Sequence, residues 1–315
     1  MSNQSNKGKL SGIISQLGPL LALLILVVVI SVLNPNFLSI NNLLNLLRQV
    51  SINGLIAFGM TFVIMTGGID LSVGSVLALS SAFTVSLMVN GINQIFAIII
   101  GLVSGAALGA INGALISKGK LAPFIATLAT MTVYRGATLV FTDGNPITAS
   151  NQEIFAFFGR GYIFGIPTPV VIYFICFVIL YVVLHKTVFG RKTYSIGGNE
   201  KAALISGVNV DKMKIKIYAI SGLMASLAGI IQASRLSSAQ PTAGQSFEID
   251  AIAAVVLGGT SMSGGRGRLV GTLIGALIIG TISNGLNLLG VSSFYQDIAK
   301  GLVIVLAMLA DRKRA

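Results

Sequence analysis

The feature that most constrains this chain is the succession of apolar stretches that divides it from end to end. A bilayer core about 30 Å thick is crossed by roughly 20 apolar helical residues. Hydrophobic residues make up 54% of the 315 residues and charged residues only 10%, well below the average of about 25% in soluble domains. We therefore expect an all-α, polytopic transmembrane bundle of about ten spans, with residues 1–315 forming a single domain. The expected spans are residues 17–33, 51–66, 71–89, 95–117, 123–141, 168–184, 217–234, 249–257, 269–288 and 294–309.

The positive charge of the chain is gathered in clusters between the apolar stretches. The formal net charge is +12, from 21 Lys and Arg against nine Asp and Glu. Loops rich in Lys and Arg stay on the cytoplasmic side of a membrane, so the clusters predict that both termini are cytoplasmic. Charge divided among separate loops argues against nucleic acid as a partner. The clusters are Lys7 with Lys9, Lys118 with Lys120, residues 186–216, Arg266 with Arg268, and residues 312–314.

Two short segments of the chain repeat one pattern. Residues 67–74 and 258–265 both read GG-x-x-x-S-x-G, and each lies between an expected inward run and an expected outward run. Transporters often contain paired helices broken at Gly, where the irregular backbone is buried in protein or lines a cavity. Two ordinary interhelical turns explain the pattern equally well. Before the first segment, residues 41–50 predict a separate interfacial helix.

Small residues recur at helical spacing in two of the expected spans. Gly101, Gly105 and Gly109 are four residues apart, as are Gly271 and Gly275. Small residues allow helix backbones to approach closely in lipid. Tight packing within one subunit explains this spacing better than a specific dimer motif does.

The sequence contains no pattern typical of a catalytic or nucleotide-binding site. A P-loop requires Gly-Lys followed by Ser or Thr, whereas Gly8-Lys9 and Gly119-Lys120 are each followed by Leu. The chain is therefore not expected to be an enzyme or to hold a cofactor. If it takes part in ATP-driven work, ATP is bound by another polypeptide.

The large basic loop contains a short segment with helix-capping residues at both ends. Asn199 is a good N-cap, Glu200 favours the positive start of a helix, and Gly207 is a good residue to end one. The two turns between them carry a small apolar face at residues 203–205. A helix this short is marginal alone in water, so it needs a surface to pack on. A soluble protein beneath the bundle is the favoured partner, and the bundle itself is the alternative.

Ionisable residues at membrane depth are costly and usually functional. Of the ionisable residues in or near the expected spans, Arg135 is the one that we most expect to lie within the hydrocarbon core of the bilayer. Asp297 and Lys300 are three residues apart on one helix face and are expected to pair. The full set is Asp70, Arg135, Arg235, Glu248, Asp250, Asp297 and Lys300.

Several of these segments together resemble a known family. The chain is similar to the permease subunits of bacterial sugar-type ABC importers, and within that family to those for ribose; the framework is shared by permeases for xylose, galactose and autoinducer-2. The segments that carry the family resemblance are residues 65–75, 197–200, 206–208 and 254–260, and those that resemble the ribose type are residues 233–244 and 285–291.

The resemblance implies a multi-pass permease of the bacterial cytoplasmic membrane that moves ribose or a related sugar inward. It implies a homodimer, an ABC ATPase subunit on the cytoplasmic side and an extracytoplasmic sugar-binding protein, with ATP held by the ATPase. The expected ATPase-coupling residues are Gly197, Gly198, Asn199, Glu200, Ala203, Ser206 and Gly207. From depth and polarity, the expected translocation-path residues are Gly67, Gly68, Asp70, Ser72, Asn112, Thr127, Arg135, Arg235 and Gln240.

Three other classes of function compete with this interpretation. An ion-coupled secondary transporter would move substrate in vesicles that contain this chain alone. A channel would conduct without an ATPase, although the sequence has no evident charged selectivity ring. A membrane-embedded enzyme is disfavoured because no nucleophile–base pair or metal constellation is visible.

Overall fold

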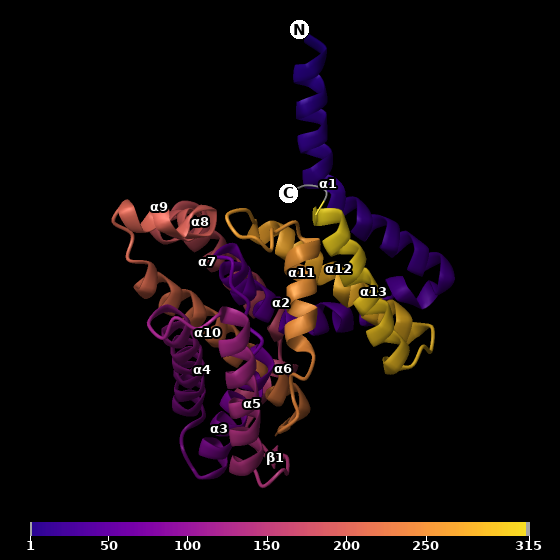
Figure 1. Ribbon diagram of the computed structural model, residues 1–315. Coiled ribbons are helices and arrows are strands. Elements are labelled where there is room, and N and C mark those ends of the chain that lie inside the picture. The colour runs from indigo at the N-terminus through magenta and orange to yellow at the C-terminus, as the bar shows by residue number, and fades with distance from the viewer. Residues whose placement is uncertain (1, 313–315) are drawn as a thin grey trace.

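The computed structural model describes residues 2–312, and thirteen α-helices dominate this part of the chain (Figure 1). Its first helices are α1 (Ser2–Leu33), α2 (Ile40–Met65), α3 (Val73–Val89), α4 (Gln94–Ser117), α5 (Pro123–Phe141), α6 (Glu153–Arg160) and α7 (Thr168–Lys186). The others are α8 (Val188–Gly198), α9 (Glu200–Ile205), α10 (Val210–Leu236), α11 (Phe247–Leu257), α12 (Leu269–Leu288) and α13 (Ser293–Arg312). The remaining elements are the 3-10 helix η1 (Pro35–Leu38) and the two-residue strands β1 (Ile147–Thr148), β2 (Tyr162–Ile163), β3 (Ile166–Pro167) and β4 (Ser238–Ala239). The expected all-α class is confirmed.

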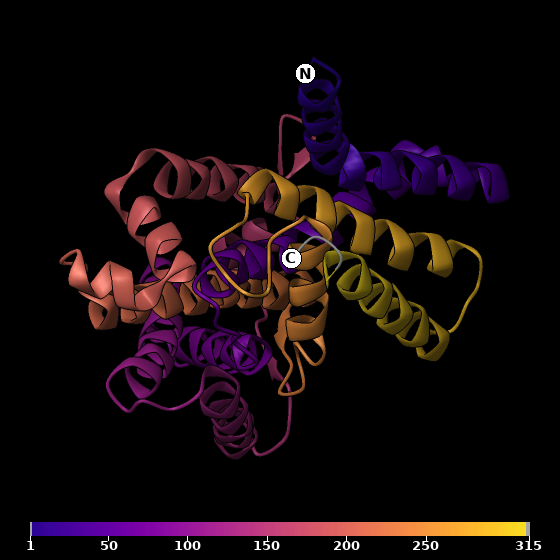
Figure 2. The same cartoon turned by 45° about the horizontal axis from the view of Figure 1, so that its top comes forward.

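Helices α2 and α10 form the centre of the bundle. In their most apolar segments 78% of α2 and 72% of α10 is buried, against 28% for α4 and for α5. The outer helices expose apolar side chains such as Ile99, Val140 and Ile179, as a surface in contact with lipid requires. Figures 1 and 2 show α1, α12 and α13 on one side of this centre and α3, α4 and α5 on the other.

Six helices in the described residues are long and apolar enough to cross a bilayer: α2, α4, α5, α7, α10 and α12. Residues 18–33 of α1 and the whole of α3 are shorter apolar helices. The expected total of about ten spans therefore stays a prediction.

Two of the expected elements are wrong: the separate interfacial helix at 41–50 and the span at 249–257. Residues 41–50 continue into the expected span at 51–66 as the single helix α2, because no Pro interrupts residues 40–65. The span at 249–257 belongs to α11, whose 11 residues extend roughly 16 Å, about half of a bilayer core. Positive-φ residues limit α11 at both ends, with Ser246 at 67° before it and Gly259 at 84° after it.

The glycine stripes pack helices together within this chain. A Cβ atom on Gly109 of α4 would lie 2.1 Å from the carbonyl oxygen of Tyr218 in α10. A Cβ atom on Gly275 of α12 would lie 1.9 Å from the carbonyl oxygen of Ala254 in α11. No larger residue fits these contacts without a backbone shift, so the packing interpretation of the stripes is confirmed.

The bundle has two ends that differ in structure. Helices α8 and α9 lie at one end, at the top of Figure 1, with the start of α1 and the end of α13 on the same side. At the opposite end β1 pairs antiparallel with β4, and β2 pairs with β3 just before α7 begins. We call these the α9 end and the hairpin end. The first helix thus begins, and the last helix ends, at the end of the bundle that carries the basic loop. The assignment of that end to the cytoplasm stays a prediction.

Candidate functional site

The short helix expected in the basic loop is present as α9. The Asn199 side chain accepts a hydrogen bond from the backbone N–H of Ala202 at 2.9 Å, which caps the start of the helix. At the other end Gly207 has a φ of 82°. The backbone N–H groups of Gly207 and Val208 donate to the carbonyls of Leu204 and Ala203, each at 3.0 Å. This is the left-handed ending that Gly favours, so both predicted caps are confirmed.

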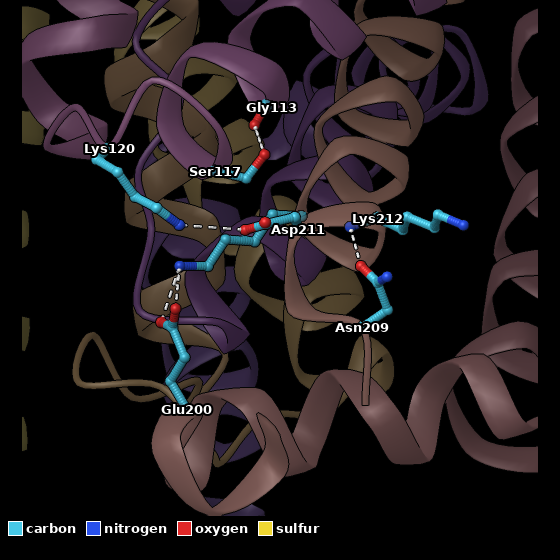
Figure 3. A network of polar contacts seen from close by, with 8 residues as sticks. Gly113, Ser117, Lys120, Glu200, Asn209, Asp211 and Lys212 are labelled. Atoms are coloured by element: carbon cyan, nitrogen blue, oxygen red, sulfur yellow. Dashed lines mark hydrogen bonds and ion pairs between the residues drawn. The ribbon is translucent and has the colours of Figure 1, made fainter. Parts of the chain in front are cut away.

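An ion pair holds α9 beside the start of α10. Both carboxylate oxygens of Glu200 accept from the Lys214 ammonium at 2.8 Å (Figure 3). The Lys214 side chain is 16% exposed and that of Glu200 51% exposed. Glu200 therefore fixes the position of α9 as well as favouring its start.

Asn209 caps the start of α10, although the sequence also offers Asp211 as a candidate cap. Asn209, the residue just before the helix, accepts from the backbone N–H of Lys212 at 3.0 Å (Figure 3). Asp211 lies in the first turn and pairs with Lys120 at 3.5 Å. The cap must be the residue before the first helical one, and α10 begins one residue earlier than Asp211.

The apolar residues of α9 divide between the bundle and the surface. Ala203 is 4% exposed and packs on the hydrophobic core. Leu204 and Ile205 are 62% and 87% exposed, and Ser206 and Gly207 are exposed beside them. The predicted apolar face therefore contributes one residue to the bundle and leaves two large side chains outside it.

The end of α8 lies directly against both glycine segments that the sequence repeats. A Cβ atom on Gly197 would lie 1.8 Å from the Met65 carbonyl oxygen and 2.4 Å from the Gly265 nitrogen. The Gly265 N–H also donates to the Met65 carbonyl at 3.0 Å. The Cβ position of Gly264 lies 3.0 Å from the Gly67 nitrogen, so the two repeated segments are helix breaks that touch each other, and the peptide leading into α9 lies beside their junction. By contrast, Gly198 has open space around its Cβ position.

Tyr194 joins α8 to the segment before α12 by a hydrogen bond. Its hydroxyl donates to the Gly267 carbonyl at 2.7 Å. Burial raises the pKa of Tyr194, while the nearby positive charge of Arg268 acts in the opposite direction. The phenol is therefore protonated near neutral pH and able to donate this bond.

Three of the expected path residues form one buried polar network. Asp70 accepts from the Ser72 hydroxyl at 2.6 Å and from the Ser221 hydroxyl at 2.8 Å. Asn112 donates to the Ser72 hydroxyl at 2.7 Å, and Tyr134 donates to the Asn112 side-chain oxygen at 3.3 Å. Asp70, Ser72 and Asn112 are at most 1% exposed. The network ties α3, α4, α5 and α10 to the first helix break.

The expected path residues Gly67, Gly68 and Thr127 lie next to this network. Gly67 is exposed with a φ of 74°, whereas Gly68 is buried and its Cβ position lies 2.6 Å from the Tyr218 hydroxyl oxygen. Thr127 donates to the carbonyl of Ile69 at 3.3 Å. Side chains from α5 and α10 thus cover the first helix break at Gly68 and Ile69, while Gly67 is left exposed.

Arg135 and Gln240 lie elsewhere, toward the loop that carries β4. The Arg135 guanidinium donates to the Pro241 carbonyl at 2.6 Å, so this half-buried cation is bonded to protein. Gln240 donates to the Ser238 hydroxyl at 3.2 Å. Neither residue joins the network around Asp70.

Arg235, the last of the expected path residues, lines a cavity of about 330 Å³ between α2, α10, α11 and α13. Lys300 lines the same cavity and its ammonium lies 3.1 Å from Asp250 and 4.0 Å from Asp297. The expected Asp297–Lys300 pair is therefore present but longer than the pair with Asp250. The structure thus divides the nine expected path residues among three places.

Sequence reasoning missed residues whose partners are distant along the chain. Lys214 lies 14 residues from Glu200, and no local spacing rule connects them. Gln232 and Asn53, which lie on two different helices, line one cavity with Asp250 of a third helix. A polar residue inside an otherwise apolar run was the available signal for Asn53 and Gln232.

The chain matches known permeases over nearly its whole length. Residues 42–308 match the family described as "Branched-chain amino acid transport system / permease component". The chain is 65% identical to the ribose import permease protein RbsC of Bacillus subtilis (strain 168), over 96% of this chain and 95% of that protein. It is 54% identical to the protein of the same name in Escherichia coli (strain K12), over 94% of this chain and 93% of the relative.

Permeases named for other sugars match at lower identity. The D-allose transport system permease protein AlsC of Escherichia coli (strain K12) is 42% identical, over 94% of this chain and 91% of the relative. No solved structure gives a significant match. The chain therefore belongs to this permease family and is a multi-pass membrane permease component of a bacterial transport system.

Proposed function

We propose that this chain is the membrane-spanning subunit of an ABC importer that carries ribose, or a closely related monosaccharide, into the cell across the cytoplasmic membrane. The observation that carries this proposal is the 65% identity to a permease named for ribose import, which extends over 96% of the chain. Permeases named for D-allose and L-arabinose are 42% and 38% identical, which favours ribose over those two sugars.

The proposed partner at the α9 end is a separate ABC ATPase subunit. Leu204 and Ile205 are exposed on α9, and a soluble partner would bury them on docking. Gly197 connects α9 to the junction of the two helix breaks. Movement of a docked ATPase would therefore be transmitted to α2, α3, α11 and α12.

We further propose a homodimer that works by alternating access, with an extracytoplasmic sugar-binding protein at the hairpin end. ATP binding would close the ATPase subunits, and the bundles would rock about the dimer axis. The nine expected path residues would face sugar in some state of this cycle. Selectivity can reside in the binding protein, so the path need not bind sugar tightly.

Uptake of radiolabelled ribose by proteoliposomes tests the proposed function. Vesicles that contain this chain, the ATPase and the binding protein should accumulate ribose only when ATP is supplied on the side of the membrane where the ATPase lies. Accumulation by the chain alone on an ion gradient would instead support a secondary transporter. Passive equilibration without ATP would support a channel.

A further inference from the structure

An exposed apolar stripe marks the lipid-facing side of α7. Ile175, Ile179 and Val182 recur at the spacing of one helix face, and all three side chains are exposed. The 19 residues of α7 extend roughly 28 Å, which is close to the thickness of a bilayer core. Lys186, the last residue of the helix, continues the stripe and is exposed. We therefore place Lys186 at the depth of the lipid headgroups.

A pair of aromatic rings next to Lys186 supports this depth. The Tyr181 ring stacks on the His185 ring, with the two ring centroids 4.4 Å apart, and both residues are partly exposed. Tyrosine side chains are enriched where the hydrocarbon core of a bilayer meets the headgroups. The α9 end of α7 thus carries residues typical of a membrane interface.

The start of α8 lies tightly against the end of α7. A Cβ atom on Gly190 would lie 1.7 Å from the Leu184 carbonyl oxygen, so the turn between the two helices leaves no space for a larger residue. The next two residues of α8 are Arg191 and Lys192, and the turn gathers them at the same corner as Lys186. We call Lys186, Arg191 and Lys192 the basic corner.

Helix α8 has one buried face and one exposed face. Its buried residues are Gly190, Thr193 and Ile196. Val188, Arg191 and Lys192 lie on the other face by their spacing. Val188 and Arg191 are exposed, and Lys192 is partly exposed. An exposed apolar residue beside two cations is typical of a helix that lies along a membrane interface.

The basic corner has no acidic partner among the residues whose side chains the structure describes. Residues 185–216 contain seven Lys and Arg against two carboxylates. Both carboxylates are already engaged, Glu200 by Lys214 and Asp211 by Lys120, and no ion pair of the basic corner is found in that part of the chain. Three positive charges at headgroup depth, with an apolar stripe on their bilayer side, match an anionic headgroup and its acyl chains.

We propose that the basic corner binds an anionic phospholipid, whose phosphate lies against Lys186, Arg191 and Lys192 and whose acyl chains lie along the stripe of α7. An acidic surface of the ATPase is the competing source of negative charge at this end. Lipid is favoured because the basic corner continues a lipid-facing stripe. In addition, the 11 residues of α8 separate its start by roughly 16 Å from α9, which carries the exposed Leu204 and Ile205. The inference does not depend on which sugar the permease carries.

Quenching of a single tryptophan by brominated lipids tests this site directly. The chain has no Trp, so Ile179→Trp introduces one reporter on the stripe of α7. Ile99→Trp, on the exposed side of α4, is its matched control, with no Lys or Arg within ten residues along the chain. Full-length protein is reconstituted in phosphatidylcholine that contains either brominated phosphatidylglycerol or brominated phosphatidylcholine. At position 179 phosphatidylglycerol should bind roughly fivefold more tightly or better, the effect of one or more positive charges at a membrane surface. At position 99 the two lipids should quench equally.

Charge substitutions in the Ile179→Trp protein identify the residues responsible. Lys186→Gln combined with Arg191→Gln should reduce the preference for phosphatidylglycerol to about twofold or less. Lys201→Gln combined with Lys212→Gln removes the same charge from exposed positions at the same end and should leave the preference unchanged. Lys186→Arg combined with Arg191→Lys keeps both charges and should retain the preference.

Three results would overturn the proposal: equal quenching by the two lipids at position 179, a preference that survives the loss of both Lys186 and Arg191, or an equal loss of preference when Lys201 and Lys212 are replaced. Inorganic phosphate that lowers the preference more than NaCl at the same ionic strength would also overturn it, by showing a site for soluble phosphate. The preference should persist when the ATPase subunit is bound. Its loss on ATPase binding would assign the basic corner to the ATPase instead of the lipid.

Discussion

Gly197 lies so close to Met65 that a Cβ atom at position 197 would be 1.8 Å from the Met65 carbonyl oxygen. This contact joins the peptide that leads into α9 to the end of α2. Because the Gly265 N–H donates to the same carbonyl, one oxygen joins α8, the end of α2 just before the first helix break, and the second break. We expect a displacement of α9 along this contact to be transmitted to both breaks.

Gly197→Ala is therefore expected to impair transport, and Gly198→Ala is its matched control. The added methyl at 197 must displace backbone, a change that typically costs about 1–3 kcal/mol. At 198 the methyl enters open space. Ribose uptake should fall about tenfold or more for Gly197→Ala, the effect of about 1.4 kcal/mol on a rate, with both proteins present in the membrane. Equal uptake by the two variants would show that the contact does not transmit movement.

The Glu200–Lys214 pair is expected to matter more for transport than for stability. A partly exposed pair of this kind contributes about 0.2–1 kcal/mol, so Glu200→Ala and Lys214→Ala should each change the melting temperature by only a few degrees. Each should nevertheless loosen α9 and reduce uptake. Lys120→Ala removes the more exposed pair with Asp211 and should leave uptake unchanged. A similar loss of uptake in all three variants would contradict a specific role for Glu200.

Asp70 is expected to be important for stability. Asp70→Ala leaves the Ser72 backbone N–H and the Ser72 and Ser221 hydroxyls without their shared acceptor, and each buried unsatisfied group costs about 1–3 kcal/mol. The melting temperature in detergent should drop clearly for Asp70→Ala, and less for Asp70→Asn, which keeps one acceptor oxygen. Glu153→Ala, at the exposed start of α6, should have little effect. An unchanged melting temperature for Asp70→Ala would show that the hydrogen bonds of Asp70 do not stabilise the fold.

The Gly109 contact predicts a second stability effect. Gly109→Ala places a methyl 2.1 Å from the Tyr218 carbonyl oxygen and should separate α4 from α10, at a cost of about 1–3 kcal/mol. Gly136→Ala, on the outer helix α5, has nothing within 4 Å of the new atom and should be neutral or slightly stabilising. Thermal unfolding of both variants in the same detergent provides the comparison, and equal melting temperatures would rule out the close α4–α10 contact.

Features governed by local chemistry were predictable from the sequence. The caps of α9 at Asn199 and Gly207 depend on residues three to five positions away, so capping preferences were sufficient. The glycine stripe of α4 was recognisable because helical spacing alone places its members on one face.

Features that depend on tertiary contacts were not predictable. The break at 258–265 meets the break at 67–74 across nearly 200 residues of chain, and the repeated pattern left open whether the two segments touch. The continuity of α2 through residue 50 was missed because a polar face next to an apolar run is also typical of two separate helices. The grouping of Asn53, Gln232 and Asp250 depends on how three helices pack.

Site-specific cross-linking of α9 tests most directly the claim that a separate ATPase drives this permease. In a Cys176→Ser background, Ile205→Cys places a thiol on the exposed side of α9, and Phe164→Cys places one at the tip of the β2–β3 hairpin, where Phe164 is fully exposed. A short bifunctional reagent added to membranes that contain the whole transport system should join the ATPase subunit to position 205 and not to position 164. Cross-linking of the ATPase at position 164, or none at position 205 while the system still transports ribose, would contradict the account.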